Sequence, residues 1–320
     1  MESIKFASII VTYRCNARCH MCNTWQYPTK SKDEIGVAVY EKLPFINTIN
    51  VTGGEPFLRA DLDDIITVLK RKSKRLVISS NGFFTDRIIK LFEKHKNIGI
   101  RISIEGLPKA NDELRGIKNG FDRGIRTLIE LHRKGIKDIG FGITVSDKNS
   151  KDLLELYYLA EWLGLEFATA ATHNSFYFHK FDNKFERPEI AIEEFQKLIS
   201  ELLKSKKPKN WFRAYFNHGL INYIRGNPRL LPCNMAHDSF FLDPLGEVLP
   251  CNVMEEPMGN LKEMSFEEIW NSKRASDVRM KVKCCEKNCW MIGSVSPAIK
   301  KNIWKPAIWI LKNRFRYAKI

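Results

Sequence analysis

The chain has 320 residues, which is enough for one large hydrophobic core with or without a small appended domain. No apolar stretch approaches the roughly 18 residues that a helix needs to span a bilayer, so the sequence excludes a protein built on membrane-spanning helices. The formal net charge is +15, and the excess is concentrated after Glu286, where the chain has basic residues and no acidic ones.

Eight cysteines occur in a chain whose first strand-like run begins near residue 4, which leaves no room for a secretory signal peptide. Disulfides are rare in reducing compartments, so the cysteines of such a chain favour metal binding. We therefore expect a cytoplasmic metalloprotein.

Up to about residue 172, apolar strand-like runs alternate with amphipathic helical patterns. Strands are expected at 4–11, 46–51, 76–79, 98–104, 139–145 and 166–172, and helices at 33–43, 62–71, 86–94, 121–134 and 152–163. This alternation is typical of a parallel sheet with helices packed on it. The sequence therefore predicts an α/β fold for this part of the chain.

The first strand leads into a loop with three cysteines, Cys15, Cys19 and Cys22, spaced C-x3-C-x2-C. Tetrahedral zinc and cubane clusters both take four ligands, so three thiolates leave one metal corner open, as catalysis requires. Two alternatives are a zinc site that takes His20 as its fourth ligand and three unrelated buried thiols. Because the loop follows a strand, it belongs to the end of the sheet where α/β barrels carry their ligand sites.

Three later strands also end in residues that suit ligand binding. Paired glycines let a backbone approach a ligand closely, a carboxylate can receive an ammonium group, and a guanidinium fork suits a carboxylate. The residues at these ends are Gly53, Gly54, Glu55 and Pro56 on the second strand, Ser79 and Asn81 on the third, and Ser103 on the fourth, which Arg115 follows.

The cysteine spacing combined with the Gly-Gly-Glu-Pro turn resembles the radical S-adenosylmethionine (radical SAM) superfamily. The resemblance implies a partial (β/α)6 barrel with a [4Fe-4S] cluster on Cys15, Cys19 and Cys22, whose fourth iron chelates the amino and carboxylate groups of SAM. Reductive cleavage of SAM would give a 5'-deoxyadenosyl radical that abstracts hydrogen from a substrate. A reductase such as flavodoxin or ferredoxin would supply the electron. The protein would hold the cofactor, aim the radical and exclude water.

The same resemblance assigns roles to individual residues. Gly53, Gly54, Glu55 and Pro56 would contact the SAM amino group, Ser79 and Asn81 its ribose or methionine portion, Ser103 and Arg115 its carboxylate, and Thr144 its ribose or adenine. Met21 stands where the superfamily commonly has an aromatic residue near adenine, and methionine is soft enough to fill that place.

The alternating pattern ends after residue 172. His173 and Asn174 follow the sixth strand, at the mouth of the expected site, and are candidates for substrate binding. Helices are expected at 188–204 and 211–224, with a basic linker at 204–209 between them. Arg213 and Tyr215 on the second of these helices are further candidates, which reach either the cleft or the surface.

Five cysteines remain: Cys233, Cys251, Cys284, Cys285 and Cys289. Two short strands around the turn at 243–246 predict a hairpin that brings the first two together, and four thiolates complete one cluster. The pattern resembles the SPASM and twitch extensions of radical SAM enzymes. A full SPASM domain uses seven cysteines for two clusters, so the twitch form with one auxiliary [4Fe-4S] cluster fits.

The resemblance favours Cys233, Cys251, Cys285 and Cys289 as the ligands of this auxiliary cluster. Cys284 is then either a spare thiol or a hydrogen donor to a substrate radical. Structural zinc at the same site is an alternative.

Residues 296–320 interleave tryptophan and aliphatic residues with lysine and arginine. This composition suits a segment lying on anionic lipid, and equally a helix docked on the barrel with a solvated basic face. Aromatic and cationic residues also serve RNA binding, but no nucleic-acid motif accompanies them, so we expect no nucleic-acid partner. A peripheral membrane contact would add a lipid-linked molecule to the candidate substrates.

The expected organisation is a radical SAM partial barrel at 1–180, a helical linker at 181–229, a twitch-like domain of a β-hairpin plus helix at 230–292, and a basic tail at 293–320. The leading functional hypothesis is an enzyme of the oxidoreductase or epimerase type. Its substrate would be a small polar molecule such as a sugar, nucleotide sugar, aminocyclitol or lipid-linked glycan.

The alternative is modification of a peptide or protein. Many such enzymes carry a leader-binding domain before the barrel, and a first strand near residue 4 leaves no room for one. A third hypothesis, a non-catalytic metal-binding regulator, has no use for the ligand-suited strand ends.

Overall fold

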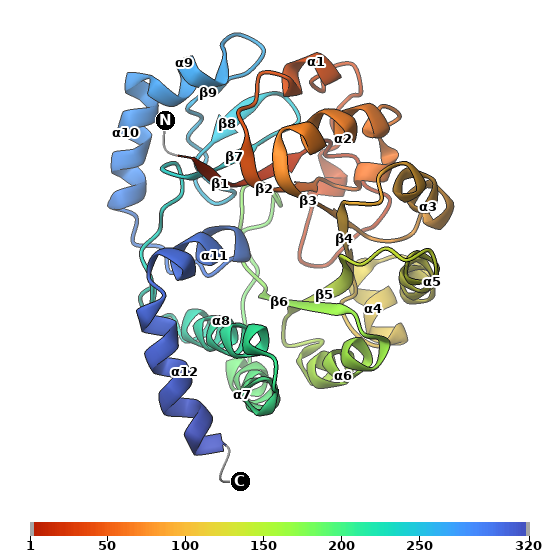
Figure 1. Ribbon diagram of the computed structural model, residues 1–320, viewed down its shortest axis with the longest axis vertical. Helices are drawn as coiled ribbons and strands as arrows, with labels where there is room; N and C mark the ends of the chain where they lie inside the picture. Colours follow the sequence, from red (N-terminus) through yellow and green to blue (C-terminus); the bar gives the residue numbers. More distant parts are fainter. Residues whose placement is uncertain (1–2, 318–320) are drawn as a thin grey trace.

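The computed structural model describes residues 3–317 (Figure 1). Within them one sheet of nine strands runs in the order β6-β5-β4-β3-β2-β1-β7-β8-β9. The first six strands pair in parallel, each with its neighbour in the chain. The α/β prediction with a parallel, partly closed barrel is therefore confirmed. The strands are β1 (Ile4–Ile10), β2 (Ile46–Thr52), β3 (Ser73–Ser80), β4 (Gly99–Ser103), β5 (Ile139–Val145), β6 (Glu166–Ala171), β7 (Ser239–Leu242), β8 (Glu247–Leu249) and β9 (Gly259–Asn260).

Amphipathic helices cover the outer face of the barrel strands (Figure 1). On α2, for example, buried apolar residues recur at helical spacing while Asp63 and Asp64 occupy the first turn, where negative charge suits the helix dipole. The barrel helices are α1 (Val37–Tyr40), α2 (Leu62–Arg71), α3 (Thr85–Lys94), α4 (Pro108–Arg115), α5 (Gly120–Arg133) and α6 (Leu153–Leu163), with short 3-10 helices η1 (Thr24–Gln26), η2 (Pro56–Leu58) and η3 (Ser150–Asp152).

Two helices of the barrel differ from the sequence prediction. The helix expected at 33–43 is reduced to α1, because the Glu34 side chain is buried among arginines and the Ile35 N–H donates to the Pro244 carbonyl at 2.9 Å. The run before Gly116 forms α4, which was not predicted. Its signals are Pro108 in the first turn and Gly116 at φ 56° beyond the last.

The predicted hairpin at 240–249 is present as the antiparallel pair β7–β8. It does not stand apart from the barrel, because β7 also pairs in parallel with β1. The helices α7 (Pro188–Lys204) and α8 (Pro208–Ile224) precede this extension. The helices that follow it are α9 (Phe266–Asn271), α10 (Lys273–Lys283), α11 (Ile292–Lys301) and α12 (Trp304–Tyr317). The division into four parts stays a prediction, since a single sheet joins two of them.

Candidate active site

A cavity of about 450 Å³ lies at the carboxyl ends of the barrel strands and extends to the C-terminal cysteines. Seven of the eight cysteines line it: Cys15, Cys19, Cys22, Cys233, Cys251, Cys285 and Cys289. Two groups that lie more than 200 residues apart in the sequence therefore face one space. Cys284 does not line the cavity and is exposed.

The loop that carries the first three cysteines is held by backbone hydrogen bonds to the turn after β2 and to the end of α4. Gly54 N–H donates to the Thr12 carbonyl at 2.7 Å, and Arg18 N–H donates to the Arg115 carbonyl at 2.9 Å. A side chain at Gly54 would overlap the Arg14 carbonyl. Gly53 and Gly54 therefore let the turn after β2 pack closely against the backbone of the cysteine loop, and both glycines line the cavity.

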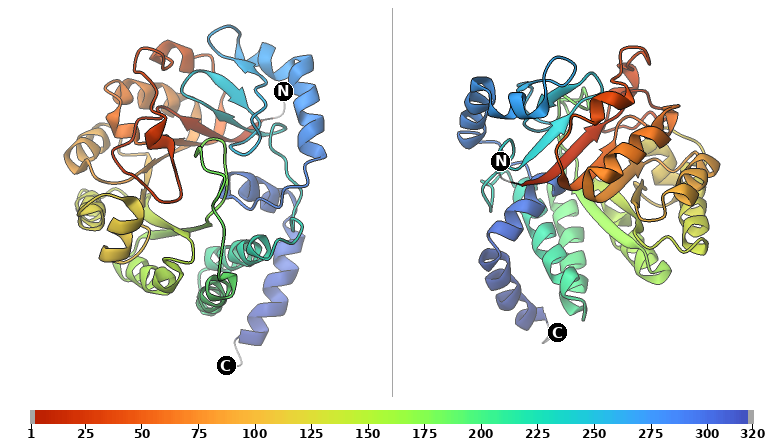
Figure 2. Two further views of the ribbon diagram at one scale, coloured as in Figure 1. Left: turned by 180° about the vertical axis from the view of Figure 1, so that it is seen from behind. Right: turned by 45° about the horizontal axis from the view of Figure 1, so that its top comes forward.

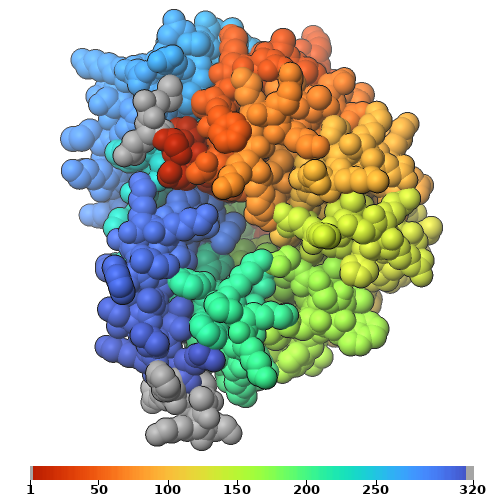
Figure 3. Space-filling view, in the orientation of Figure 1, coloured from red at the N-terminus to blue at the C-terminus, as the bar shows by residue number. Residues whose placement is uncertain are grey.

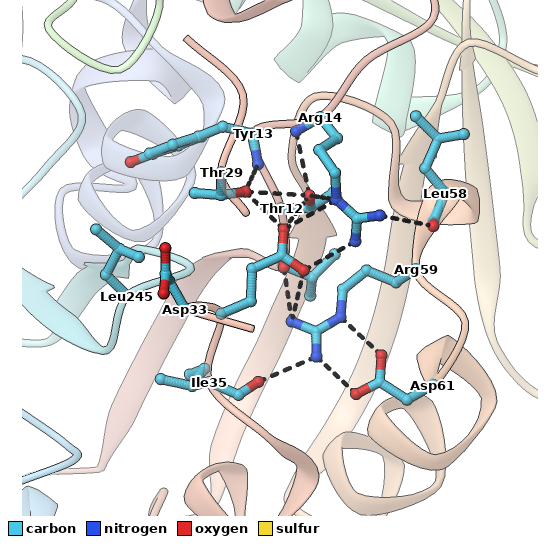
Figure 4. Close-up of polar contacts among 12 residues, drawn as sticks. Thr12, Tyr13, Arg14, Thr29, Asp33, Ile35, Leu58, Arg59, Asp61 and Leu245 are labelled. Carbon is cyan, nitrogen blue, oxygen red and sulfur yellow. Dashed lines mark hydrogen bonds and ion pairs between the residues drawn. The ribbon is translucent and has the colours of Figure 1, made fainter. Parts of the chain in front are cut away.

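A buried carboxylate fixes the start of this loop. Glu34 forms an ion pair with Arg14 at 2.9 Å and lies 3.7 Å from the guanidinium of Arg59. Its Oε1 also accepts hydrogen bonds from the hydroxyls of Thr12 and Thr29. Figure 4 shows Arg14 beside these threonines and Arg59 below them, with Arg59 also reaching Asp61. The network joins the end of β1 to the segment before α1 and to the turn after η2.

The first three cysteines are half-buried, and the environment of their thiols opposes ionisation. Burial is the main cause of a raised pKa in all three thiols. The pKa of Cys15 rises to about 12, and the pKa values of Cys19 and Cys22 are raised as well. The Arg115 guanidinium acts in the opposite direction on all three pKa values. Buried thiols of this kind become thiolates when a cation binds them, so the donor set fits a metal centre.

Arg115 is the principal cation of the cavity wall. It is nine-tenths buried, and its Nη1 donates to Glu105 Oε1 at 3.2 Å. Its Nε is buried and has no hydrogen-bond partner within the described residues. An orphaned guanidinium N–H at the cavity wall is suited to an anionic group such as the carboxylate of SAM.

Glu55 is fully buried behind the cavity wall. Its oxygens accept hydrogen bonds from Ser80 Oγ at 2.9 Å, Asn81 N–H at 2.8 Å and Phe57 N–H at 3.1 Å. Burial raises the pKa of the Glu55 carboxyl, while these donors lower it. In this structure Glu55 joins the ends of β2 and β3 and does not line the cavity.

The structure brings most of the other residues predicted to bind SAM to the cavity. Those that line it are Met21, Gly53, Gly54, Ser79, Asn81, Ser103, Arg115 and Thr144. Pro56 begins η2 and lies outside the lining. The Ser79 hydroxyl is directed to Asn50 Oδ1 at 3.0 Å, and Asn81 Nδ2 donates to Asn16 Oδ1 at 2.7 Å.

The four substrate candidates divide into two groups. His173 lines the cavity, where burial lowers its pKa and favours the neutral ring. Asn174 is exposed and bonded to Asn183. Arg213 and Tyr215 do not reach the cavity: Arg213 is ion-paired with Glu166, and Tyr215 packs against Trp290 and Trp309. The neighbouring Phe216 of α8 lines it instead.

The second cysteine group is anchored on α8 through Trp290. The Trp290 Nε1–H donates to the Phe216 carbonyl at 2.8 Å, and the ring lies over Gly219, where any side chain would overlap it. Arg229 stands over the same ring at 5.6 Å and donates to the Cys289 carbonyl. Burial raises the pKa of Cys251 to about 11. Burial also raises the pKa of Cys289, and the positive charge of Arg229 acts to lower it.

Residues 173–183 form a strap between β6 and α7, and apart from His173 and Asn174 none of its residues was expected at the site. Tyr177 in it donates a hydrogen bond to the Gly53 carbonyl, and Ser175 donates to the Asn252 carbonyl. Asn183 Nδ2 donates to the Met21 carbonyl at 3.1 Å. The strap thus joins the cysteine loop, the glycine turn and the C-terminal extension. Figure 2 (left) shows this green segment passing between the red N-terminal loop and the blue C-terminal elements.

The cysteines fit clusters better than single ions. Within residues 3–317, no three Cys, His, Asp or Glu side chains converge closely enough to hold one metal ion. Zinc needs four ligands within about 2.3 Å of one point, whereas a cubane takes each thiolate on a different iron. His20, the alternative zinc ligand, is exposed and lies 3.0 Å from the Lys148 ammonium.

Fold and site together define an iron–sulfur enzyme whose cysteine loop follows the first strand of a parallel barrel. The sequence model of the Radical SAM superfamily matches residues 9–159, and that of SPASM, an iron–sulfur cluster-binding domain, matches residues 233–290. Residues 9–159 thus form a radical SAM domain, and residues 233–290 form an iron–sulfur domain of the SPASM or twitch type. The cofactors of the chain are SAM, a SAM-binding [4Fe-4S] cluster and an auxiliary [4Fe-4S] cluster.

Two curated proteins and one solved structure illustrate the similarity. Fe-coproporphyrin III synthase of Methanosarcina barkeri is 31% identical over 47% of this chain and 39% of its own length. Sporulation killing factor maturation protein SkfB of Bacillus subtilis is 24% identical over 89% of this chain and 68% of its own. The structure of Streptococcus suis SuiB bound to precursor peptide SuiA has a TM-score of 0.64 at 15% identity, covering 90% of this chain and 72% of that one. At this identity the likeness shows the fold alone.

Among the described residues, no helix combines the length and the apolar character needed to cross a bilayer.

Proposed function

We propose that this radical SAM enzyme modifies a peptide or protein. In this proposal Cys15, Cys19 and Cys22 hold the SAM-binding cluster, and Cys233, Cys251, Cys285 and Cys289 hold the auxiliary cluster. When bound and reduced, the first cluster supplies the electron that cleaves SAM and so generates the radical that takes hydrogen from the substrate. An external reductase, of the flavodoxin or ferredoxin kind, provides that electron.

The observation that carries the substrate proposal is the apolar wall that part of the cavity lining forms. Its side chains are Phe178, Phe216, Met235, Phe240, Met254, Trp290 and Met291. A sugar or aminocyclitol packed against this wall would leave the hydroxyl or amino groups on that side without partners, and each such group costs a few kcal/mol. An apolar peptide side chain has no such cost. The wall therefore supports the peptide alternative over the small polar substrate.

The polar residues of the cavity lie mainly on the barrel strand ends, where they suit SAM. Arg115 would bind the SAM carboxylate through its free Nε–H, with Ser103 beside it on the cavity wall. Glu55 would act indirectly, because it orients Ser80 and the Asn81 backbone. Tyr177 and the rest of the strap would limit entry of water to the cysteine loop.

Two comparisons agree with a peptide substrate. SkfB is named a maturation protein of a killing factor, and SuiB has been solved with its precursor peptide. Fe-coproporphyrin III synthase indicates a different class, the tetrapyrroles, which the same experiment examines.

The test is substrate-dependent formation of 5'-deoxyadenosine by anaerobically reconstituted protein with SAM and dithionite. Three probe sets are compared: a random-sequence peptide library, a panel of nucleotide sugars and aminocyclitols, and Fe-coproporphyrin III. We expect stimulation by the peptide library together with mass changes in a subset of peptides, and none in a Cys15→Ala variant. Stimulation by the sugars or the porphyrin, but not by peptides, would refute the proposal.

A further inference from the structure

The C-terminal helix α12 has two apolar faces, and only one of them is covered. On the inner face Ile310 is buried, Trp309 stacks on His218 at 4.8 Å, and Arg314 lies 3.9 Å from the Trp211 ring. These contacts dock α12 against α7 and α8. Figure 3 shows the blue C-terminal residues on the surface beside the teal residues of α8.

The outer face carries a stripe of large apolar side chains. Trp304, Ile308 and Leu311 are 77%, 52% and 58% exposed. At 100° per residue, positions i, i+4 and i+7 fall within one narrow sector, opposite the buried Pro306 and Ile310. A helix that needed only to dock on the barrel would carry polar residues in this sector. The outer stripe therefore requires a contact of its own.

Two exposed lysines, Lys305 and Lys312, lie along one side of the stripe, whereas Arg314 on the other side packs over Trp211 of α8. No ion pair joins Lys305 or Lys312 to an acidic group of the described chain, and the sequence has no acidic residue after Glu286. Large apolar side chains beside lysines without acidic partners match the boundary between acyl chains and anionic headgroups.

We propose that the outer face of α12 docks on an anionic lipid surface, with Trp304, Ile308 and Leu311 inserted and Lys305 and Lys312 against the headgroups. RNA fits less well, because aliphatic residues such as Ile308 and Leu311 offer no surface for base stacking. A protein partner would not require lysines without acidic partners beside an apolar stripe. The proposal is independent of the substrate, since α12 does not line the cavity.

The experiment is flotation of the full-length reconstituted protein with two kinds of vesicle, phosphatidylcholine alone and phosphatidylcholine mixed with phosphatidylglycerol. We expect binding to the anionic vesicles that weakens with salt. A Trp304→Gln/Ile308→Gln/Leu311→Gln variant should bind at least about tenfold more weakly, because it loses the apolar insertion. A Lys305→Gln/Lys312→Gln variant should lose roughly thirtyfold at low salt, at about 1 kcal/mol per lysine.

The matched control is Tyr158→Gln/Trp162→Gln on α6, whose side chains are 44% and 82% exposed without belonging to the stripe. It should bind vesicles as the wild type does. Circular dichroism and iron content establish that each variant is folded, and Trp304→Gln alone replaces the triple variant if that one fails to fold. No binding of the wild type to anionic vesicles, or equal loss in the α6 control, overturns the proposal. The proposal is also overturned if the protein does not bind vesicles but uses the stripe to self-associate or to bind a labelled single-stranded RNA.

Discussion

Arg115 and Glu105 form an ion pair inside the cavity wall, 3.2 Å between Nη1 and Oε1, and the pair leaves the Arg115 Nε–H unused. Glu105 Oε2 in turn accepts from the Thr144 N–H at 2.6 Å, so the carboxylate is held between α4 and β5. Glu105 thus holds the arginine in the cavity lining, and the Arg115 Nε–H is buried there without a partner among the described residues.

The first prediction concerns this arginine. Arg115→Gln should weaken SAM binding roughly ten- to hundredfold, because a charge-assisted hydrogen bond contributes about 1.5–3 kcal/mol. Equilibrium binding of SAM to the reconstituted protein measures the effect. Arg101→Gln is the control, since Arg101 on β4 is bonded to Asp138 and does not line the cavity. Equal losses in the two variants would contradict the assignment.

The second prediction separates the adjacent cysteines. Cys285 lines the cavity and Cys284 is exposed at the end of α10, so Cys285→Ala should lower the iron content by about four per chain. Cys284→Ala should keep its iron and its ability to form 5'-deoxyadenosine. Iron and acid-labile sulfide analysis after anaerobic reconstitution gives the answer. Loss of turnover in Cys284→Ala with full iron would restore Cys284 as a hydrogen donor.

The third prediction concerns the base of the cysteine loop. Glu34→Gln removes the carboxylate that pairs with Arg14 and leaves the buried Arg59 only Asp61 as a countercharge, so it should lower the free energy of unfolding by about 2 kcal/mol. Glu41→Gln breaks an exposed pair with Arg71 and should cost less than about 1 kcal/mol. Denaturant unfolding of the reconstituted proteins compares them. Similar values for both variants would show that the buried network does not stabilise the loop.

The fourth prediction is a pH dependence from Asp243, in the hairpin turn. Burial raises the pKa of its carboxyl from 3.8 to about 6. The folded protein therefore holds a proton that the unfolded chain releases, so this group's contribution to stability grows as the pH falls from about 6 toward 4. The full difference is up to about 3 kcal/mol.

Asp243→Asn should remove this part of the pH dependence. Thermal unfolding of wild type and variant between pH 5 and 7.5 measures it, as the difference between the two proteins at each pH. If the difference does not change with pH, Asp243 ionises normally in the folded protein.

The parts of the structure that could be predicted from sequence are those with local signals. Strand-like runs followed by glycines or small polar residues located the ends of β1 to β4, and parallel strands bring such ends to one edge. The resemblance to SPASM and twitch domains favoured Cys285 over Cys284 as a ligand, which stays a prediction, and Cys285 is the one of the two that lines the cavity. Helical periodicity located α8 but did not show which of its faces points to the cavity. Arg213 and Tyr215 were therefore the candidates from sequence, whereas Phe216 is the residue that lines the cavity.

The parts that could not be predicted depend on long-range contacts. The strap residue Tyr177 bonds to Gly53 across more than a hundred residues, and nothing in the local sequence marks it as part of the site. Likewise, the local sequence at 33–36 predicts a helix, but ion pairing with Arg14 and Arg59, which lie elsewhere in the chain, buries the Glu34 side chain. The apolar wall that changed the substrate hypothesis joins residues from five separate segments.

The pairing of β7 with β1 has a consequence for electron exchange. β1 runs directly into the first cysteine loop, and β7 leads through β8 to Cys251, so a ladder of backbone hydrogen bonds connects the two proposed cluster sites. Electron tunnelling slows steeply with distance, and a flexible connection would let that distance fluctuate. Here the strand register fixes Cys251 relative to the first cysteine loop, as a rigid spacer would, whereas the segment with Cys285 and Cys289 is positioned by α10 and by the contact of Trp290 with α8.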